Sequence, residues 1–332
     1  MRTLIYLKPP KTVKKYKQWI VDISNGEYRS YLTVRDVNKI GRRHWIFCDI
    51  QNREVHLLSD GERRMYMELI YKPNTVAIFE QYALDLDETL DIAVELNILH
   101  PRNWKTKEAY VMSTDFLVET VSEDGQTTQL TAYTFKYWDQ IFKLNWLDEV
   151  EYKSMRTWQK FAIEREFWRR RDIEYRVVTE RDATKVQYHN KLFSELAKDL
   201  KVSNEKLTEF LTCFCDKWQL APWLQLQDLI KQVSNTLAIS DSYARQLFRF
   251  SVLYGFLPIF QECEEHMIRW FHPVSLIQDP SQRGGDFQID SAVSNSSLKL
   301  GYCRHPCLHF LILRSCASVI RHLSAHLSIT NN

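Results

Sequence analysis

The chain has 332 residues, a length typical of about two domains, and its 45% apolar and 26% charged residues indicate a folded protein. A formal net charge of only +2 does not by itself indicate any class of partner. No segment approaches the roughly 20 apolar residues of a membrane-spanning helix, and the opening MRTLIYLKPPK is too short an apolar run for a secretory signal. We therefore expect a cytoplasmic protein with reduced thiols.

The charge distribution is more informative than its sum. Residues 1–19 contain six Lys and Arg residues and no acid. We interpret them as a basic N-terminal arm and expect Lys14, Lys15 and Lys17 to contact a phosphate backbone. A solvated arm without a partner explains the pattern equally well.

Strand and helix patterns alternate from there to about residue 184. Strands are predicted at 31–34, 45–50, 55–58, 76–79 and 175–179, and helices at 62–71, 86–96 and 154–171. A hairpin is predicted from strands 110–119 and 127–135, because the turn-forming residues Ser122-Glu-Asp-Gly-Gln126 separate them.

After about residue 185 helical periods dominate. The segment 237–250 is similar to the turn and second helix of a helix-turn-helix, with Ser240 as the helix N-cap, although an ordinary helical bundle explains it at least as well. A Gly-, Asp- and Ser-rich break begins near residue 279. The predicted division is an arm (1–19), an α/β domain (20–184), a mainly helical domain (185–278), and a linker with an irregular tail (279–332).

A second basic stretch lies on the predicted helix 154–171, where Trp158 and Trp168 are interleaved with Lys and Arg. We expect Arg165, Arg169 and Arg170 to contact DNA. A solvated helix face is the alternative interpretation.

Four side chains could form a catalytic cluster. Asp115 lies on one strand of the hairpin, and Thr134 and Lys136 share one face of the partner strand. Glu62 comes from a preceding helix. Mg²⁺ prefers oxygen ligands and needs only one or two carboxylates besides water and phosphate, and two such ions can assist phosphodiester cleavage.

Spacing alone does not establish such a site. An Asp and a Lys on a hairpin are more often an exposed cross-strand pair, worth about 0.2–1 kcal/mol. A Glu in the first turn of a helix often only complements the helix dipole.

Residues 28–182 resemble the catalytic domain of TnsA, the endonuclease component of TnsA–TnsB–TnsC transposons. The resemblance is carried by Arg42–His44, Val55-His-Leu-Leu-Ser-Asp60 with Glu62 following, Glu80-Gln81, His100-Pro101, Val111-Met-Ser-Thr-Asp-Phe-Leu-Val118, Lys136 and Glu164-Arg-Glu-Phe-Trp168. It implies a restriction-endonuclease-like α/β fold, with a mixed sheet flanked by helices, followed by a helical, winged-helix-like C-terminal domain.

The resemblance also implies roles. Glu62 and Asp115 would bind Mg²⁺, with two ions or Mn²⁺ as further options, Lys136 would be the catalytic lysine, and Glu164 would support the site. The position two before the lysine is Gln in the family but Thr134 here, a shorter metal ligand that puts its role in question. The implied partners are transposon-end DNA, a TnsB-like transposase and a TnsC-like AAA+ ATPase in a bacterial cytoplasm.

Two other functions remain open from the sequence. One is a restriction or repair nuclease that acts alone, and the other is a DNA-binding scaffold whose nuclease site has weakened. The sequence contains no glycine-rich phosphate loop, so ATPase activity is not indicated. Cys303, Cys307 and His309 offer zinc ligands, but such a cluster is more often accidental.

Overall fold

The protein is described here from a computed structural model. It describes residues 10–37, 41–122, 125–147, 149–257 and 259–277. The described chain forms two compact units. The first contains the residues before Met67 together with Thr75–Asp182, and the second contains Met67–Asn74 and the residues from Ala183. The predicted tail and its Cys303–His309 cluster lie outside the described residues.

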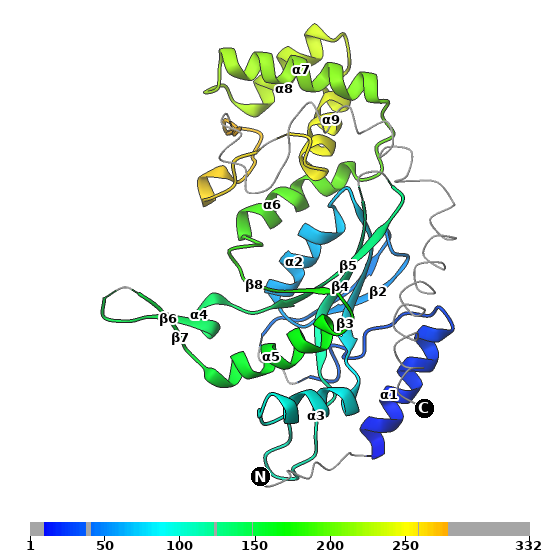
Figure 1. The fold of residues 1–332 in the computed structure, drawn as a ribbon. Coiled ribbons are helices and arrows are strands. Elements are labelled where there is room, and N and C mark those ends of the chain that lie inside the picture. Colours follow the sequence, from blue (N-terminus) through cyan, green and yellow to red (C-terminus); the bar gives the residue numbers. More distant parts are fainter. Residues whose placement is uncertain (1–9, 38–40, 123–124, 148, 258, 278–332) are drawn as a thin grey trace. The chain divides into compact units, whose positions relative to one another are not determined.

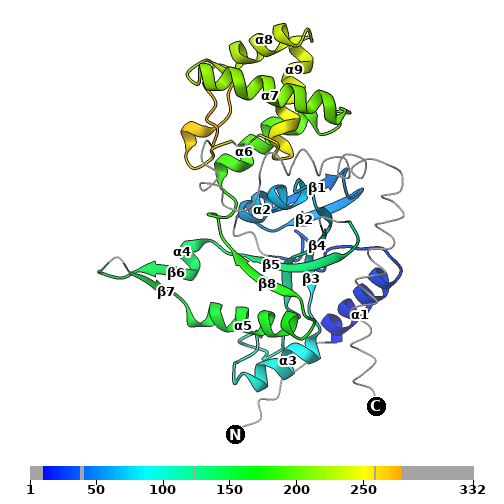
Figure 2. The same ribbon diagram turned by 45° about the horizontal axis from the view of Figure 1, so that its top comes forward.

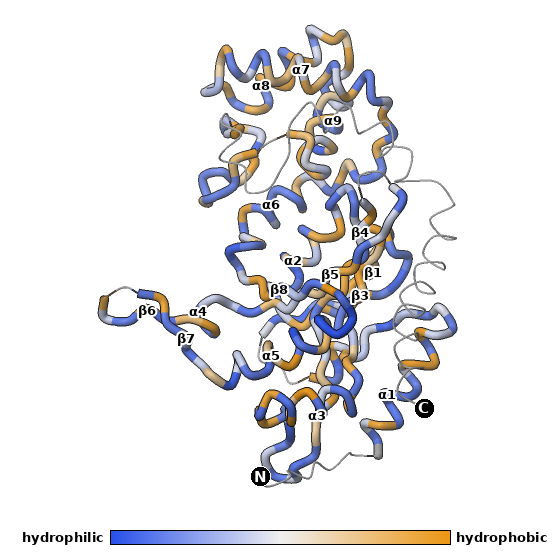
Figure 3. The backbone as a smooth tube through the Cα atoms, viewed as in Figure 1, coloured by the Kyte–Doolittle hydropathy of each residue, from blue (hydrophilic) through white to orange (hydrophobic). Residues whose placement is uncertain are grey.

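A four-stranded mixed sheet organises the first unit, in the order β3 (Thr75–Ala83), β4 (Ser113–Val121), β5 (Thr128–Phe135) and β8 (Glu174–Val178) (Figure 1). The first three strands are antiparallel, and β8 is parallel to β5. The predicted hairpin is therefore present as β4 and β5. Figure 3 shows hydrophobic colour concentrated along the central strands, as expected for strands covered on their faces.

Helices cover this sheet. They are α1 (Pro10–Ser24), α2 (Asp60–Ile70), α3 (Leu86–Glu95) and α5 (Met155–Arg169). Helix α5 begins at Ser154, whose side chain caps the N–H of Thr157, and it buries Ile163, Phe167 and Trp168 in the core. Burial of such apolar side chains, at about 25 cal/mol per Å², holds helix and sheet together.

Smaller elements complete the unit. Strands β1 (His44–Cys48) and β2 (Arg53–Leu57) form an antiparallel pair. Between β5 and α5 the chain forms α4 (Trp138–Ile141) and a hairpin of β6 (Phe142–Leu144) and β7 (Val150–Tyr152). Figures 1 and 2 both show this hairpin extending away from the four-stranded sheet.

Two local expectations differ from the structure. Much of the predicted basic arm is helix, because Trp19 and Ile23 lie one turn apart and are both buried in the core of the first unit. The predicted strand at 31–34 is absent, because Thr33 and Asp36 close a turn in which the Thr33 N–H donates to Asp36 Oδ2 at 2.8 Å.

The second unit contains the end of α2 and is otherwise mainly helical. Its helices are α6 (Lys185–Ser194), η1 (Glu195–Ala197), α7 (Asn204–Leu220), α8 (Leu226–Thr236), α9 (Asp241–Leu253) and η2 (Glu264–His266). Ser240 caps α9 by accepting from the Tyr243 N–H, as predicted. A separate core surrounds Phe210, Phe214 and Phe248, so this unit has its own hydrophobic interior.

Within the described residues, no helix combines the length and apolar character required to cross a bilayer.

Candidate active site

A local reversal of the pleat lies on β3, which is an edge strand of the four-stranded sheet. Gln81 on β3 has a φ of 51°, a left-handed conformation that is rare without glycine and costs about 1–3 kcal/mol. Phe79 and Tyr82 on either side both pack in the same core, whereas regular alternation would place them on opposite faces. The β3–β4 register pairs Glu80 with Phe116 and Tyr82 with Thr114, so Gln81 lies opposite Asp115 where the pleat reverses.

The Gln81 amide bridges two carboxylates. Its Nε2 donates to Glu62 Oε2 at 3.3 Å and to Asp115 Oδ1 at 3.2 Å. Its Oε1 accepts from the Ser113 hydroxyl at 3.0 Å, which fixes the orientation of the amide. One side chain on β3 thus joins a carboxylate from α2 to a carboxylate from β4.

Glu62 reaches this point because it lies in the first turn of α2. Its backbone N–H donates to the Ser59 hydroxyl at 3.1 Å, and its carboxylate accepts from that hydroxyl at 3.0 Å and from the Leu58 N–H at 2.8 Å. The side chain is 7% exposed. Burial, and then the neighbouring Asp115 carboxylate, raise the pKa of Glu62 above its usual range, while the three hydrogen-bond donors oppose the rise.

Asp115 is held from the other side by β5. The Phe135 N–H donates to its Oδ2 at 2.7 Å. Burial raises the pKa of Asp115, and the Phe135 N–H, the Gln81 amide and the charge of Lys136 oppose the rise. Lys136 is exposed, and its backbone N–H donates to Val178 O at 2.9 Å. The structure thus brings Glu62, Asp115 and Lys136 to one end of the sheet.

Glu164 on α5 forms an adjoining buried cluster. It accepts from the Thr134 hydroxyl at 2.7 Å and from the Thr114 hydroxyl at 3.3 Å. The Trp168 indole in turn donates to Thr114 at 2.8 Å. Burial is the main reason that the pKa of Glu164 rises to about 8. Thr134 therefore serves as a hydrogen-bond donor to Glu164 in this structure.

Whether this site suits a divalent cation depends on the oxygen ligands that its side chains offer. Within the described residues, no group of three or more His, Cys, Asp or Glu side chains could hold a metal ion by itself. Glu62 and Asp115 nevertheless offer hard oxygen ligands on either side of one amide nitrogen, the Gln81 Nε2. Two carboxylates suit Mg²⁺, which retains waters and binds substrate phosphate.

The predicted DNA-binding residues lie in different surroundings. Lys14 and Lys17 are exposed on α1, whereas Lys15 pairs with Asp36 at 3.2 Å and lies over the Tyr31 ring. Arg165 is exposed on α5.

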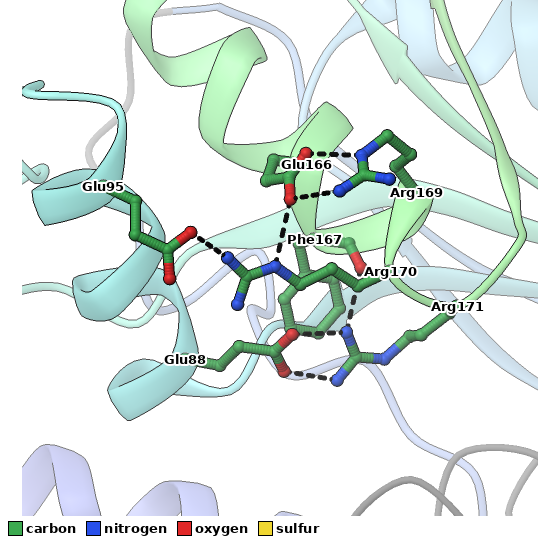
Figure 4. Close-up of polar contacts among 7 residues, drawn as sticks. All are labelled: Glu88, Glu95, Glu166, Phe167, Arg169, Arg170 and Arg171. Atoms are coloured by element: carbon green, nitrogen blue, oxygen red, sulfur yellow. Dashed lines mark hydrogen bonds and ion pairs between the residues drawn. The ribbon is translucent and has the colours of Figure 1, made fainter.

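The other two arginines on α5 are held by acids. Arg169 pairs with Glu166 at 2.7 Å, and Arg170 pairs with both Glu166 and Glu95, as Figure 4 shows. A phosphate would have to compete with these carboxylates.

Residues 72–180 match the family described as TnsA-like endonuclease N terminal. The match contains Asp115, Lys136 and Glu164 and begins after Glu62.

One relative covers more of the chain. The transposon Tn7 transposition protein TnsA of Escherichia coli is 30% identical over 183 residues, which are 55% of this chain and 61% of that protein. The chain thus spans about three fifths of the length of this TnsA-type relative. Together with the mixed sheet flanked by helices and the helical second unit, the comparisons confirm the predicted α/β fold class.

Gln81 is the side chain in this site to which the sequence assigned no role. Glu80-Gln81 belongs to the motifs behind the resemblance, but nothing in the local pattern indicates a positive φ at a non-glycine position inside a strand. Only the pairing of β3 with β4 shows why an amide is needed there.

Proposed function

We propose that the chain is a metal-dependent DNA endonuclease subunit of a heteromeric transposase, cutting the 5′ strands at the transposon ends. The observation that carries the proposal is the buried Glu62–Gln81–Asp115 bridge beside Lys136. A transposition protein as relative, and a TnsA-like endonuclease domain around Asp115, support the same assignment.

Glu62 and Asp115 would hold Mg²⁺, either one ion or two, and Mn²⁺ has similar ligand preferences. The bound metal would polarise the phosphate and lower the pKa of a coordinated water. Gln81 keeps both carboxylates in place, and its amide donors offset part of their mutual repulsion. The Lys136 ammonium is available to stabilise the negative charge that develops on the phosphate oxygens during cleavage.

The supporting residues act through position. Glu164 would support the end of β5, where its bonds to Thr134 and Thr114 tie β4 and β5 to α5. Thr134 would influence metal affinity through its hydrogen bond to Glu164. If the Thr134 hydroxyl oxygen were also a metal ligand, binding of the metal would compete with this hydrogen bond.

The division of labour between domains is part of the proposal. Residues 20–184 would cut DNA, with Lys14, Lys15, Lys17 and Arg165 contacting its backbone. Residues 185–278 would contact a TnsC-like ATPase, and a TnsB-like transposase would cut and join the 3′ ends. Such a complex acts on DNA in the bacterial cytoplasm.

The test uses Asp115→Ala and the near-isosteric Asp115→Asn in a transposition reaction reconstituted with the partner proteins. Both variants should lose 5′-strand cleavage while 3′-end joining continues, so that co-integrates replace simple insertions. Ser122→Ala, in the turn that follows β4, is the control. Unchanged simple insertions with the Asp115 variants would contradict the proposal.

Two other outcomes identify the alternatives. Mg²⁺-dependent cleavage by the purified chain without partners would indicate a nuclease that acts alone. A wild-type chain that binds DNA and partners but does not cleave would indicate a scaffold, which the engagement of Thr134 by Glu164 would then explain.

A further inference from the structure

The basic stretch on α5 divides into two groups with different environments. At its C-terminal end, Arg170 and Arg171 connect α5 to α3 through Glu95 and Glu88, and Arg169 pairs with Glu166 on α5 itself. Arg171 pairs with Glu88 at 2.5 Å, next to the Arg169 and Arg170 pairs in Figure 4. These cations stabilise the helix packing, and their charge is locally balanced.

Arg156 and Lys160 belong to the other group. With Glu164 they are spaced four residues apart, so all three lie along one face of α5. The contact between Glu164 and Thr134 directs this face towards the end of β5. Arg156 and Lys160 therefore lie on the same face of α5 as Glu164, closer to the start of the helix.

The topology places Lys136 beside them. Strands β5 and β8 are parallel neighbours, and α5 is the helix of the connection between them, so α5 runs back along the sheet. Because α5 runs antiparallel to β5, Lys160 lies in the same direction from Glu164 as Lys136 lies from Thr134. Lys160 and Lys136 consequently lie on the same side of the Glu164–Thr134 contact.

The electrostatics agree with this placement. Burial lowers the pKa of Lys160, and the charges of Arg156 and Lys136 lower it further, while Glu164 raises it. Within the described residues, neither Lys136 nor Lys160 forms an ion pair with a carboxylate. Arg156 donates to the Leu99 carbonyl and to the Gln159 side-chain oxygen, the latter at 3.1 Å.

The charge of Lys160 is repelled by Arg156 and by Lys136, and neither lysine has an ion-pair partner among the described residues, so an anionic ligand would be favourable beside them. We propose that Arg156 and Lys160, together with Lys136, bind successive phosphates of the DNA strand next to the bond that is cut. Arg156 and Lys160 are positioning residues, whereas Lys136 lies at the reacting phosphate. The proposal rests on the proposed nuclease function and specifies how its substrate is held.

The test measures binding of a fluorescent duplex carrying the transposon end, with a chelator present so that no cleavage occurs. The dissociation constant is determined from about 50 to 200 mM salt for the wild type, Lys160→Ala, Arg156→Gln and Arg169→Ala. Each phosphate contact contributes about 0.9 to the slope of log affinity against log salt. Lys160→Ala and Arg156→Gln should each lower the slope by about 0.9 and weaken binding about eightfold at 0.1 M salt.

Arg169→Ala is the matched control, since it removes the same charge from the same helix at an arginine already held by Glu166. Arg169→Ala should leave the slope and the affinity unchanged. Lys160→Arg keeps the positive charge and should therefore have the slope and affinity of the wild type, unlike Lys160→Ala. Equal melting temperatures of these variants and the wild type would exclude loss of folding as the cause.

The outcomes separate the two proposals. If the wild type binds and cleaves DNA but Lys160→Ala and Arg156→Gln keep its slope, the phosphate contacts are wrong and the nuclease function stands. Equal losses with Arg169→Ala would also overturn the inference, because attraction would then be general to α5. If the wild type neither binds nor cleaves transposon-end DNA with its partners present, the proposed function itself fails.

Discussion

The substitution Gly61→Ala tests how tightly α2 is packed against β5 beside the site. Gly61 directly precedes Glu62. A Cβ at this position would lie 1.9 Å from Cε1 and 2.1 Å from Cζ of Phe135, whereas carbon atoms in contact are about 3.5–4.0 Å apart. The Phe135 ring is 6% exposed and packs edge-on against Tyr137, so it has little room to move.

Two effects of opposite sign compete in this variant. Replacing a helical glycine by alanine stabilises by roughly 0.4–1 kcal/mol where the new methyl group fits. Forcing an extra methyl group into a packed interior costs about 1–3 kcal/mol. Because the overlap with Phe135 is severe, we take the upper end of that range and expect a net destabilisation of about 2 kcal/mol.

The site should be affected as well. Relief of the overlap moves either the first turn of α2, which carries Glu62, or Phe135, whose N–H donates to Asp115 at 2.7 Å. Either movement alters the distance between the two carboxylates, so the Mg²⁺ concentration needed for cleavage should rise.

Urea denaturation followed by tryptophan fluorescence measures the effect on stability. Gly61→Ala should lower the midpoint without changing the slope. Gly41→Ala is the control, because a Cβ at Gly41 meets nothing within 4 Å and its midpoint should stay within the error. Combining Gly61→Ala with Phe135→Leu should recover part of the loss relative to the sum of the single changes. A midpoint for Gly61→Ala equal to or above that of the wild type would refute the packing described here.

Two further predictions concern charge. The folded-state pKa of Glu164 is about 8 against an ordinary 4.5, so the folded chain retains a proton there that the unfolded chain releases. The stability this contributes is complete below about pH 4.5 and is lost as the pH rises to about 8. Glu164→Gln should therefore be more resistant to urea than the wild type at pH 9 and nearly equal to it at pH 4, and parallel pH profiles would contradict this. Lys136→Ala should slow single-turnover cleavage about 10²–10³-fold, as loss of a charge-stabilising donor does, with little change in melting temperature. Normal cleavage with a lowered melting temperature would show that Lys136 is structural.

The sequence by itself determined the elements whose patterns are local. The alternation along β4 and β5 and the Ser122–Gln126 turn predicted the hairpin, and Ser240 predicted the start of α9. The hairpin and the resemblance also predicted that Glu62, Asp115 and Lys136 belong to one site. The hairpin and the helix start were predicted correctly because hydrophobic periodicity, turn chemistry and helix capping depend on residues a few positions apart.

Other features depend on contacts between distant parts of the chain, and the sequence did not indicate them. The helix α1 forms where an arm was expected, because the sheet supplies a core for Trp19 and Ile23. Strands β6 and β7 form a hairpin that the sequence did not predict. Trp146 between them is 88% exposed, so apolar residues in this segment do not mark a buried face.

The same distinction holds for the chemistry of the site. The basic residues of α5 look alike in the sequence, yet acids on α3 and α5 balance Arg169 and Arg170, while Lys160 faces the side of Lys136. Gln81 joins carboxylates 19 and 34 positions away. Residue types indicated which chemistry was possible, but the pairing of β3 with β4 and the packing of α5 decided which charges meet, because electrostatic energy depends on distance in space and not on separation along the chain.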